Sequence, residues 1–207
     1  MTQPSLSDDL AYVRAVAESG RNAPLLGGRF LAWWGGLLGP AYLIHYGLAS
    51  DRLPLGDMAY FYMWGGFMLI GTAGFFALVR KVSPETPGQA SVGAQVEANV
   101  WKIAGFVLSA YFLTLFVKAF TGGDAIAGFE HSLSVVFSVY AIALFTSGAV
   151  VGNRVLKTAA YGALAMIALS TWFAGTAEIW AVAALGVFLT VFLPGVVLMV
   201  REPRGAA

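Results

Sequence analysis

The chain has 207 residues, of which 58% are hydrophobic and only 11% charged; it contains no cysteine and carries a formal net charge of +1. The lack of cysteine excludes disulfides, thiolate metal sites, cysteine nucleophiles and cysteine lipidation. A net charge so close to zero gives no indication of a nucleic-acid partner, and none is expected. The apolar excess is instead typical of a protein embedded in a membrane.

The first 28 residues form a polar segment ahead of the first apolar stretch. Ser5 or Ser7 can cap a short amphipathic helix here, and Asp8 suits its positive N-terminal end. We predict that one face of this helix docks a protein partner, through Leu10, Tyr12, Val13, Val16 and Ala17. The alternative is that the helix packs under the membrane domain or lies on the lipid surface. The segment lacks the basic start and short apolar run of a cleaved signal peptide, so the first apolar stretch is expected to persist.

Six apolar stretches follow, each close to the roughly 20 helical residues that cross a hydrocarbon core about 30 Å thick. They cover residues 30–49, 58–79, 100–120, 132–152, 158–177 and 179–200. An isolated strand would leave its backbone polar groups unpaired in lipid, whereas a helix pairs them internally. We therefore predict an all-α polytopic bundle of six transmembrane helices over residues 29–201, with a short tail at 202–207.

The basic residues predict the orientation of this bundle. Six crossings place both termini on one side, and ten of the 12 Lys and Arg residues fall on that side. They are Arg14, Arg21, Arg29, Arg80, Lys81, Lys102, Arg154, Lys157, Arg201 and Arg204. Only Arg52 and Lys118 fall on the other. The positive-inside rule makes the termini cytoplasmic. Compact ends without an organelle address favour a bacterial cytoplasmic (inner) membrane, with lipids as the immediate surroundings.

Small residues predict where helices approach closely. Gly35 and Gly39 form a GxxxG pair in the first stretch, and Gly66, Gly71 and Gly74 interrupt the second. In lipid, where no hydrophobic force drives helices together, such residues permit close backbone contact. We expect tight packing within the chain; the alternative is a homo-oligomer that forms through the GxxxG pair.

Residues capable of chemistry gather at the outer ends of the stretches. His45 lies near the outer end of the first stretch and His131 opens the fourth, so both are expected at a similar membrane depth. The predicted outward-facing polar vestibule comprises His45, Lys118, Asp124, Glu130, His131, Ser134 and Ser138. Two neutral imidazoles are candidate ligands for a metal ion or haem iron. The alternative is that these residues bond loops or contact lipid headgroups.

No phosphate-binding loop, nucleophile elbow or HExxH helix is present in the sequence, which argues against an enzyme. We predict a non-enzymatic accessory or regulatory membrane component that has no cofactor and contacts a partner through its N-terminal helix. One alternative is a small-molecule transporter or channel, whose mouth is the vestibule and whose flexible elements are helix breaks at Pro40 and Pro194. Another is a metal- or haem-binding redox protein with His45 and His131 as ligands.

Overall fold

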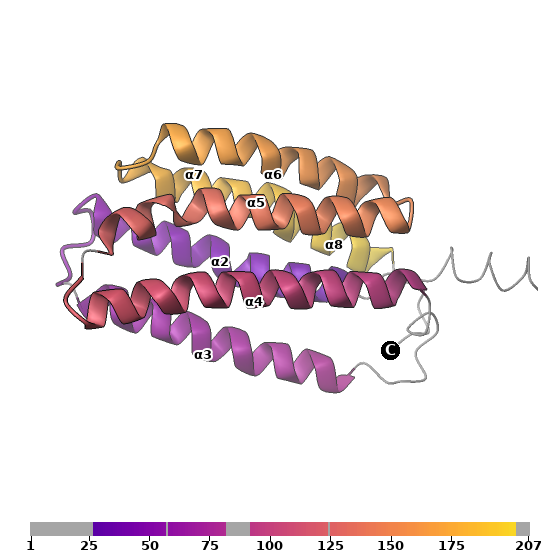
Figure 1. Cartoon of the computed structure of the whole chain (residues 1–207), viewed down its shortest axis with the longest axis horizontal. Helices are drawn as coiled ribbons and strands as arrows, with labels where there is room; N and C mark the ends of the chain where they lie inside the picture. Colours follow the sequence, from indigo (N-terminus) through magenta and orange to yellow (C-terminus); the bar gives the residue numbers. More distant parts are fainter. Residues whose placement is uncertain (1–26, 57, 82–91, 124, 202–207) are drawn as a thin grey trace, which may run out of the picture.

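A computed structural model describes residues 27–56, 58–81, 92–123 and 125–201, and all regular structure in these ranges is helical (Figure 1). The elements are α2 (Gly27–Ala49), α3 (Met58–Lys81), α4 (Val92–Phe120), α5 (Ile126–Val150), α6 (Arg154–Trp172), α7 (Glu178–Val187), the π-helical η1 (Phe188–Phe192) and α8 (Leu193–Val200). The predicted all-α bundle is confirmed.

Five of the helical stretches are long and apolar enough to cross a membrane: Met58–Lys81, Gly93–Phe120, Ala127–Val150, Arg154–Trp172 and Glu178–Val200. These helices support a multipass membrane protein. The remaining long helix, α2, has 23 residues but contains Trp33, Trp34, Pro40 and His45, which lower its hydropathy. A sixth crossing through α2, and the orientation of the termini, stay predictions.

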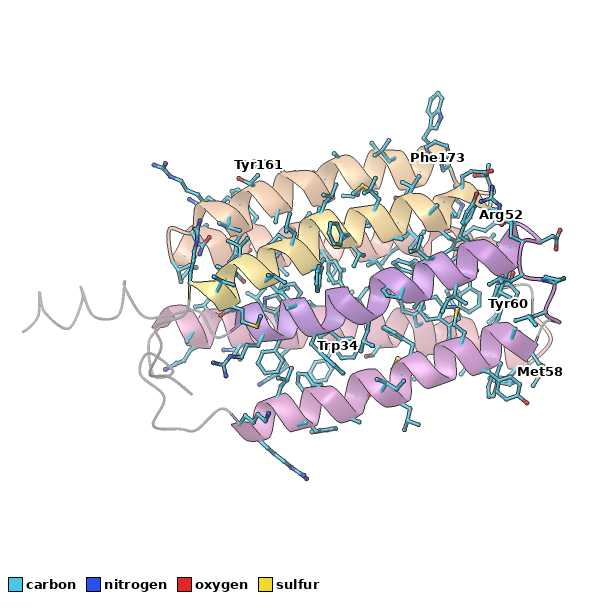
Figure 2. All side chains as sticks on the ribbon, turned by 180° about the vertical axis from the view of Figure 1, so that it is seen from behind. Trp34, Arg52, Met58, Tyr60, Tyr161 and Phe173 are labelled. Atoms are coloured by element: carbon cyan, nitrogen blue, oxygen red, sulfur yellow. The ribbon has the colours of Figure 1, made fainter. Side chains whose placement is uncertain are left out.

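Helix α2 lies at the centre of the bundle, although it is not among the five stretches that are apolar enough to cross a membrane by composition. It contacts α3 on one side and α7, η1 and α8 on the other, and Figure 2 shows it between α8 and α3. Protein neighbours rather than lipid therefore cover much of its surface. This position explains how a helix of modest hydropathy fits inside a membrane bundle.

Glycines allow α2 to pack directly against η1 and α8. At Gly35, an added Cβ would lie 2.6 Å from the backbone nitrogen of Phe192. At Gly195 of α8, it would overlap the backbone of Ala32. Gly35 thus packs within the chain, as expected, whereas an added Cβ at Gly39 would meet no atom within 4 Å.

The main core lies between α2, α5, α6, α7 and α8. Its fully buried side chains include Leu133 and Phe137 of α5, Leu156 of α6, and Ile179 and Val187 of α7. By contrast, the only buried residue of α3 is Gly71. Helix α3 is therefore an outer element, and most of its apolar surface is available to lipid.

Two adjacent tryptophans attach α3 to α2. The indole nitrogen of Trp33 donates a hydrogen bond to the carbonyl of Gly71 at 3.1 Å, and its ring lies against Gly74. The ring of Trp34, labelled in Figure 2, lies against Gly71 and 5.9 Å from Phe67. Gly71 and Gly74 therefore make room for aromatic side chains of α2, whereas an added Cβ at Gly66 would meet no atom within 4 Å.

Several predicted boundaries differ from the observed helices. Helix α4 begins at Val92 rather than at residue 100, and α5 begins at Ile126 rather than at residue 132. His131 consequently lies inside α5 instead of opening it. Helix α6 ends at Trp172 rather than at residue 177, and Gly175 in the following turn has φ 81°. An apolar run marks the hydrocarbon thickness, but helices continue past it until a cap or turn stops them.

The predicted break at Pro194 takes the form of a π-helical turn. Proline has no backbone N–H and cannot complete the regular bond to the carbonyl of Thr190. The preceding turn widens, and the N–H of Leu193 bonds to the carbonyl of Phe188 five residues earlier. Such π-turns are inserted into otherwise continuous helices. Helix α2 likewise continues through Pro40.

Candidate functional site

The most elaborate polar arrangement surrounds His45, near the end of the bundle where α2 stops and α3 begins. We call this the His45 end and the opposite one the Gly27 end. The imidazole stacks on Trp180 of α7 with ring centroids 3.6 Å apart, and the edge of Tyr60 of α3 approaches it at 4.8 Å. Tyr42 contacts both Trp64 and Trp180 at 5.8 Å. Together Tyr42, Tyr60, Trp64 and Trp180 form an aromatic box around His45.

A hydrogen bond determines which nitrogen of His45 is available. The indole nitrogen of Trp64 donates to Nδ1 of His45 at 3.1 Å. Indole can only donate, so Nδ1 must be the accepting nitrogen, and the neutral imidazole carries its proton on Nε2. Nε2 bonds to no residue in the described part of the chain. The half-buried His45 therefore presents one oriented N–H donor from an aromatic environment.

This hydrogen bond argues against His45 as a metal ligand. Coordination through Nε2 requires the proton on Nδ1, where it would face the N–H of Trp64. Coordination through Nδ1 would displace Trp64. Within the described ranges, moreover, no group of three or more His, Cys, Asp or Glu residues could hold a metal ion.

A positive charge lies at the same end of the bundle as the aromatic box. The guanidinium carbon of Arg52, in the α2–α3 loop, lies 4.9 Å from the centre of the Tyr46 ring, a cation–π contact. Figure 2 shows Arg52, Met58 and Tyr60 at the same end of the bundle. The loop is held back onto α2 because the N–H of Leu53 bonds to the carbonyl of Gly47. Arg52 and the Nε2 donor would both suit a ligand that bears an oxygen acceptor or negative charge.

Two of the predicted vestibule residues belong to a different part of the bundle. Ser134 of α5 shares hydrogen bonds with Ser170 at 3.0 Å and Thr171 at 3.1 Å, both on α6. The hydroxyl of Ser138 donates to the carbonyl of Ser134. Ser134 thus joins α5 to α6, as polar side chains commonly do between membrane helices, whereas the bond of Ser138 stays within α5.

The remaining members of the vestibule are not joined to His45 either. His131 and Lys118 are exposed and Glu130 is half-buried, while Asp124 lies outside the described residues. Among the residues that the structure describes, no hydrogen bond or ring contact joins His45 to this set. The vestibule stays a prediction, because similar depth alone does not bring side chains together.

The predicted docking surface, Leu10, Tyr12, Val13, Val16 and Ala17, lies wholly outside the described residues. Comparison of the chain with protein-family models, with curated proteins and with solved structures finds no match. Its function is therefore argued from its own residues.

Sequence reasoning missed the partners of His45 and one buried carboxyl. Tyr60 and Trp64 are four residues apart and so share a helix face, a pattern that could have predicted an aromatic surface beside His45. Glu97 appeared to precede the third apolar stretch, but it lies within α4 and is only 6% exposed. Val96 and Val100 are four residues apart, a helical spacing that could have placed Glu97 on the same helix as the third stretch.

Proposed function

We propose that this chain is a non-enzymatic multipass membrane protein that acts as an accessory or regulatory component and contacts a protein partner through residues 1–26. The observation that carries this proposal is the position of α2. The N-terminal segment runs directly into Gly27, and α2 contacts α3, α7 and α8. A partner that binds the segment would therefore act on the central helix of the bundle.

Two substitutions two residues apart test the docking surface. Val13→Asp places a carboxylate on the face that Val13 would share with Leu10 and Ala17, whereas Ala15→Asp places it about 200° further around the helix. Burial of an unpaired carboxylate costs several kcal/mol. We therefore expect Val13→Asp to reduce the amount of partner recovered from mild detergent at least about tenfold, and Ala15→Asp to leave it near the wild-type level.

Quantitative mass spectrometry of the co-purified proteins makes this comparison, with the same expression level for each variant. A chain that lacks residues 1–22 should behave like Val13→Asp. An unchanged set of partners after this truncation, or equal losses for the two point variants, would show that the segment does not dock a partner.

A second candidate function is transport or channel activity with the His45 end as its mouth. It is favoured by the Nε2 donor of His45, which bonds to no described residue, and by the positively charged Arg52 at the same end of the bundle. A rigidly held donor, an aromatic wall and a nearby guanidinium are features of sites that bind small anionic or carbonyl-bearing molecules.

The test is uptake of radiolabelled small organic acids by proteoliposomes. His45→Phe keeps a ring that can stack on Trp180 but removes the Nε2 donor, and one hydrogen bond is worth about 1 kcal/mol or more. Uptake should fall roughly five- to tenfold. Ser134→Ala is the control, since Ser134 bonds across α5 and α6, and it should have a smaller effect. Wild-type vesicles that take up no more than protein-free vesicles would rule out this candidate for these solutes.

A further inference from the structure

One carboxyl group in the bundle has a buried oxygen that no described residue bonds. Glu97 lies in α4 and is 6% exposed. Its Oε1 atom is buried and accepts no hydrogen bond, and no ion pair joins Glu97 to another residue within the described ranges. Buried polar groups are almost always hydrogen-bonded. A buried group without a partner loses its hydrogen bonds to water and gains none from the protein. An orphan carboxyl in a membrane helix is therefore a strong indication of a role.

The carboxyl group lies against Gly27, the first residue of α2. A Cβ at Gly27 would overlap Oε1 of Glu97 and lie 3.0 Å from its Cδ. Glycine thus leaves the space that the carboxyl occupies. This contact is also one of the few places where α4 approaches α2, because α4 packs mainly against α5.

Within the part of the chain that the structure describes, no charged side chain is paired with Glu97. On α4, Lys102 is five residues away and points roughly 140° around the helix. On α2, Arg29 follows Gly27 by two residues and has an interaction of its own. On α5, which packs against α4, the ring of Tyr140 lies 5.9 Å from the ring of Trp101.

These surroundings favour the uncharged acid over the carboxylate. A buried carboxylate needs a cation or several N–H donors to replace its hydration, and Glu97 has neither among the described residues. The neutral acid carries its own O–H and needs no counter-ion.

We propose that Glu97 is a proton-binding site of the membrane domain, with its carboxyl seated on Gly27 between α4 and α2. This role is separate from partner docking and from ligand binding at the His45 end. The site lies at the Gly27 end of the bundle, opposite the His45 end, and its test measures the protonation of Glu97 itself rather than partner recovery or uptake.

Dicyclohexylcarbodiimide is a suitable probe because it dissolves in apolar regions and reacts with protonated carboxyls. The acid proton moves to a carbodiimide nitrogen, the carboxylate oxygen adds to the central carbon, and the adduct rearranges to a stable N-acylurea. No other reactant is needed. Glu178, which is exposed at the His45 end, provides the matched carboxyl within the same chain.

The full chain in membrane vesicles is treated with this reagent, and peptide mass spectrometry measures the adduct at each carboxyl. We expect at least a tenfold preference for Glu97 over Glu178, and the reverse preference with a water-soluble carbodiimide. Labelling of Glu97 should decrease as pH rises, since the reaction requires the bound proton. Equal labelling of the two residues by the apolar reagent, or no labelling of Glu97 at any pH, would overturn the proposal.

Infrared spectroscopy gives a second measurement that needs no reactive probe. The carbonyl band of a neutral, buried carboxylic acid should be present in the wild-type protein and absent from Glu97→Gln. If Glu97→Gln does not fold, Gly27→Ala serves instead, because it displaces the carboxyl and should shift the band and reduce labelling by the apolar reagent. An unchanged band in the folded variant would assign it to another carboxyl and contradict the proposal.

Discussion

Gly195→Val is expected to cause the largest loss of stability of any single substitution considered. An added Cβ at this position would overlap the backbone nitrogen of Ala32 and lie 2.8 Å from the carbonyl carbon of Leu31. Backbone atoms cannot rotate out of the way, so α8 and α2 must separate. Overpacking costs roughly 1–3 kcal/mol and occasionally more, and separation of these helices would also disturb the contact at Gly35. We expect a loss of about 3 kcal/mol or more.

Gly65→Ala in α3 is the matched control. Gly65 is exposed, and an added Cβ there would meet no atom within 4 Å. Alanine favours the helix over glycine by about 1 kcal/mol, so this variant should be as stable as the wild type or slightly more so. Thermal unfolding of both proteins in the same detergent, followed by circular dichroism, provides the measurement. Equal midpoint temperatures of unfolding for Gly195→Val and Gly65→Ala would mean that α2 and α8 do not approach as closely as described.

The existence of the helices was predictable from the sequence, but their ends were not. The length of an apolar stretch reflects the thickness of the hydrocarbon core. The start of a helix is instead determined by side chains that cap its first N–H groups. Helix α6 begins after Asn153, whose side-chain oxygen accepts hydrogen bonds from the N–H groups of Val155 and Leu156. An asparagine beside basic residues looked like part of a loop, so the predicted start was four residues too late.

The sequence indicated that His45 lies near one end of its helix, but it did not predict which side chains surround it. Hydropathy gives the depth of a residue in the membrane and says nothing about the direction in which its helix faces. His45 and His131 were expected at one depth, yet α2 contacts α3 and α7, whereas α5 contacts α4 and α6. Trp180, which stacks on His45, is far away in sequence. Lipid-embedded helices are apolar on all sides, and this removes the periodic signal that normally indicates which helices pair.

The contact between Glu97 and Gly27 was not predicted from the sequence. The predicted third stretch, 100–120, leaves Glu97 outside the membrane domain's third span, whereas α4 begins at Val92 and includes it. The structure buries it because Gly27 provides space beside α4. A glycine in one segment and a glutamate in another do not form a recognisable sequence pattern.

Labelling of single cysteines should reveal all-or-none differences between the two membrane faces, since the chain has no native cysteine. An impermeant thiol reagent added outside intact cells should react with Ser50→Cys and with Thr121→Cys, a residue that is exposed in the α4–α5 turn. It should reach Ser91→Cys and Ala206→Cys only after the membrane is permeabilised. Insertion of a Lys or Arg at the centre of a membrane helix costs roughly 2.5–3.5 kcal/mol of free energy. Because ten of the 12 basic residues fall on the predicted inner side, we expect one orientation to dominate.

The pair that brackets α2 decides the number of crossings. Ser7→Cys lies before α2 and Ser50→Cys directly after it, so a membrane-spanning α2 places them on opposite faces. Labelling of both from the same side would show that α2 does not cross, which would leave the five spans whose composition alone supports insertion. Labelling of Ser7 from outside and of Ser50 from inside would reverse the orientation while keeping the crossing. Because α2 is covered by α3 on one side and by α7 and α8 on the other, we expect it to cross despite its modest hydropathy.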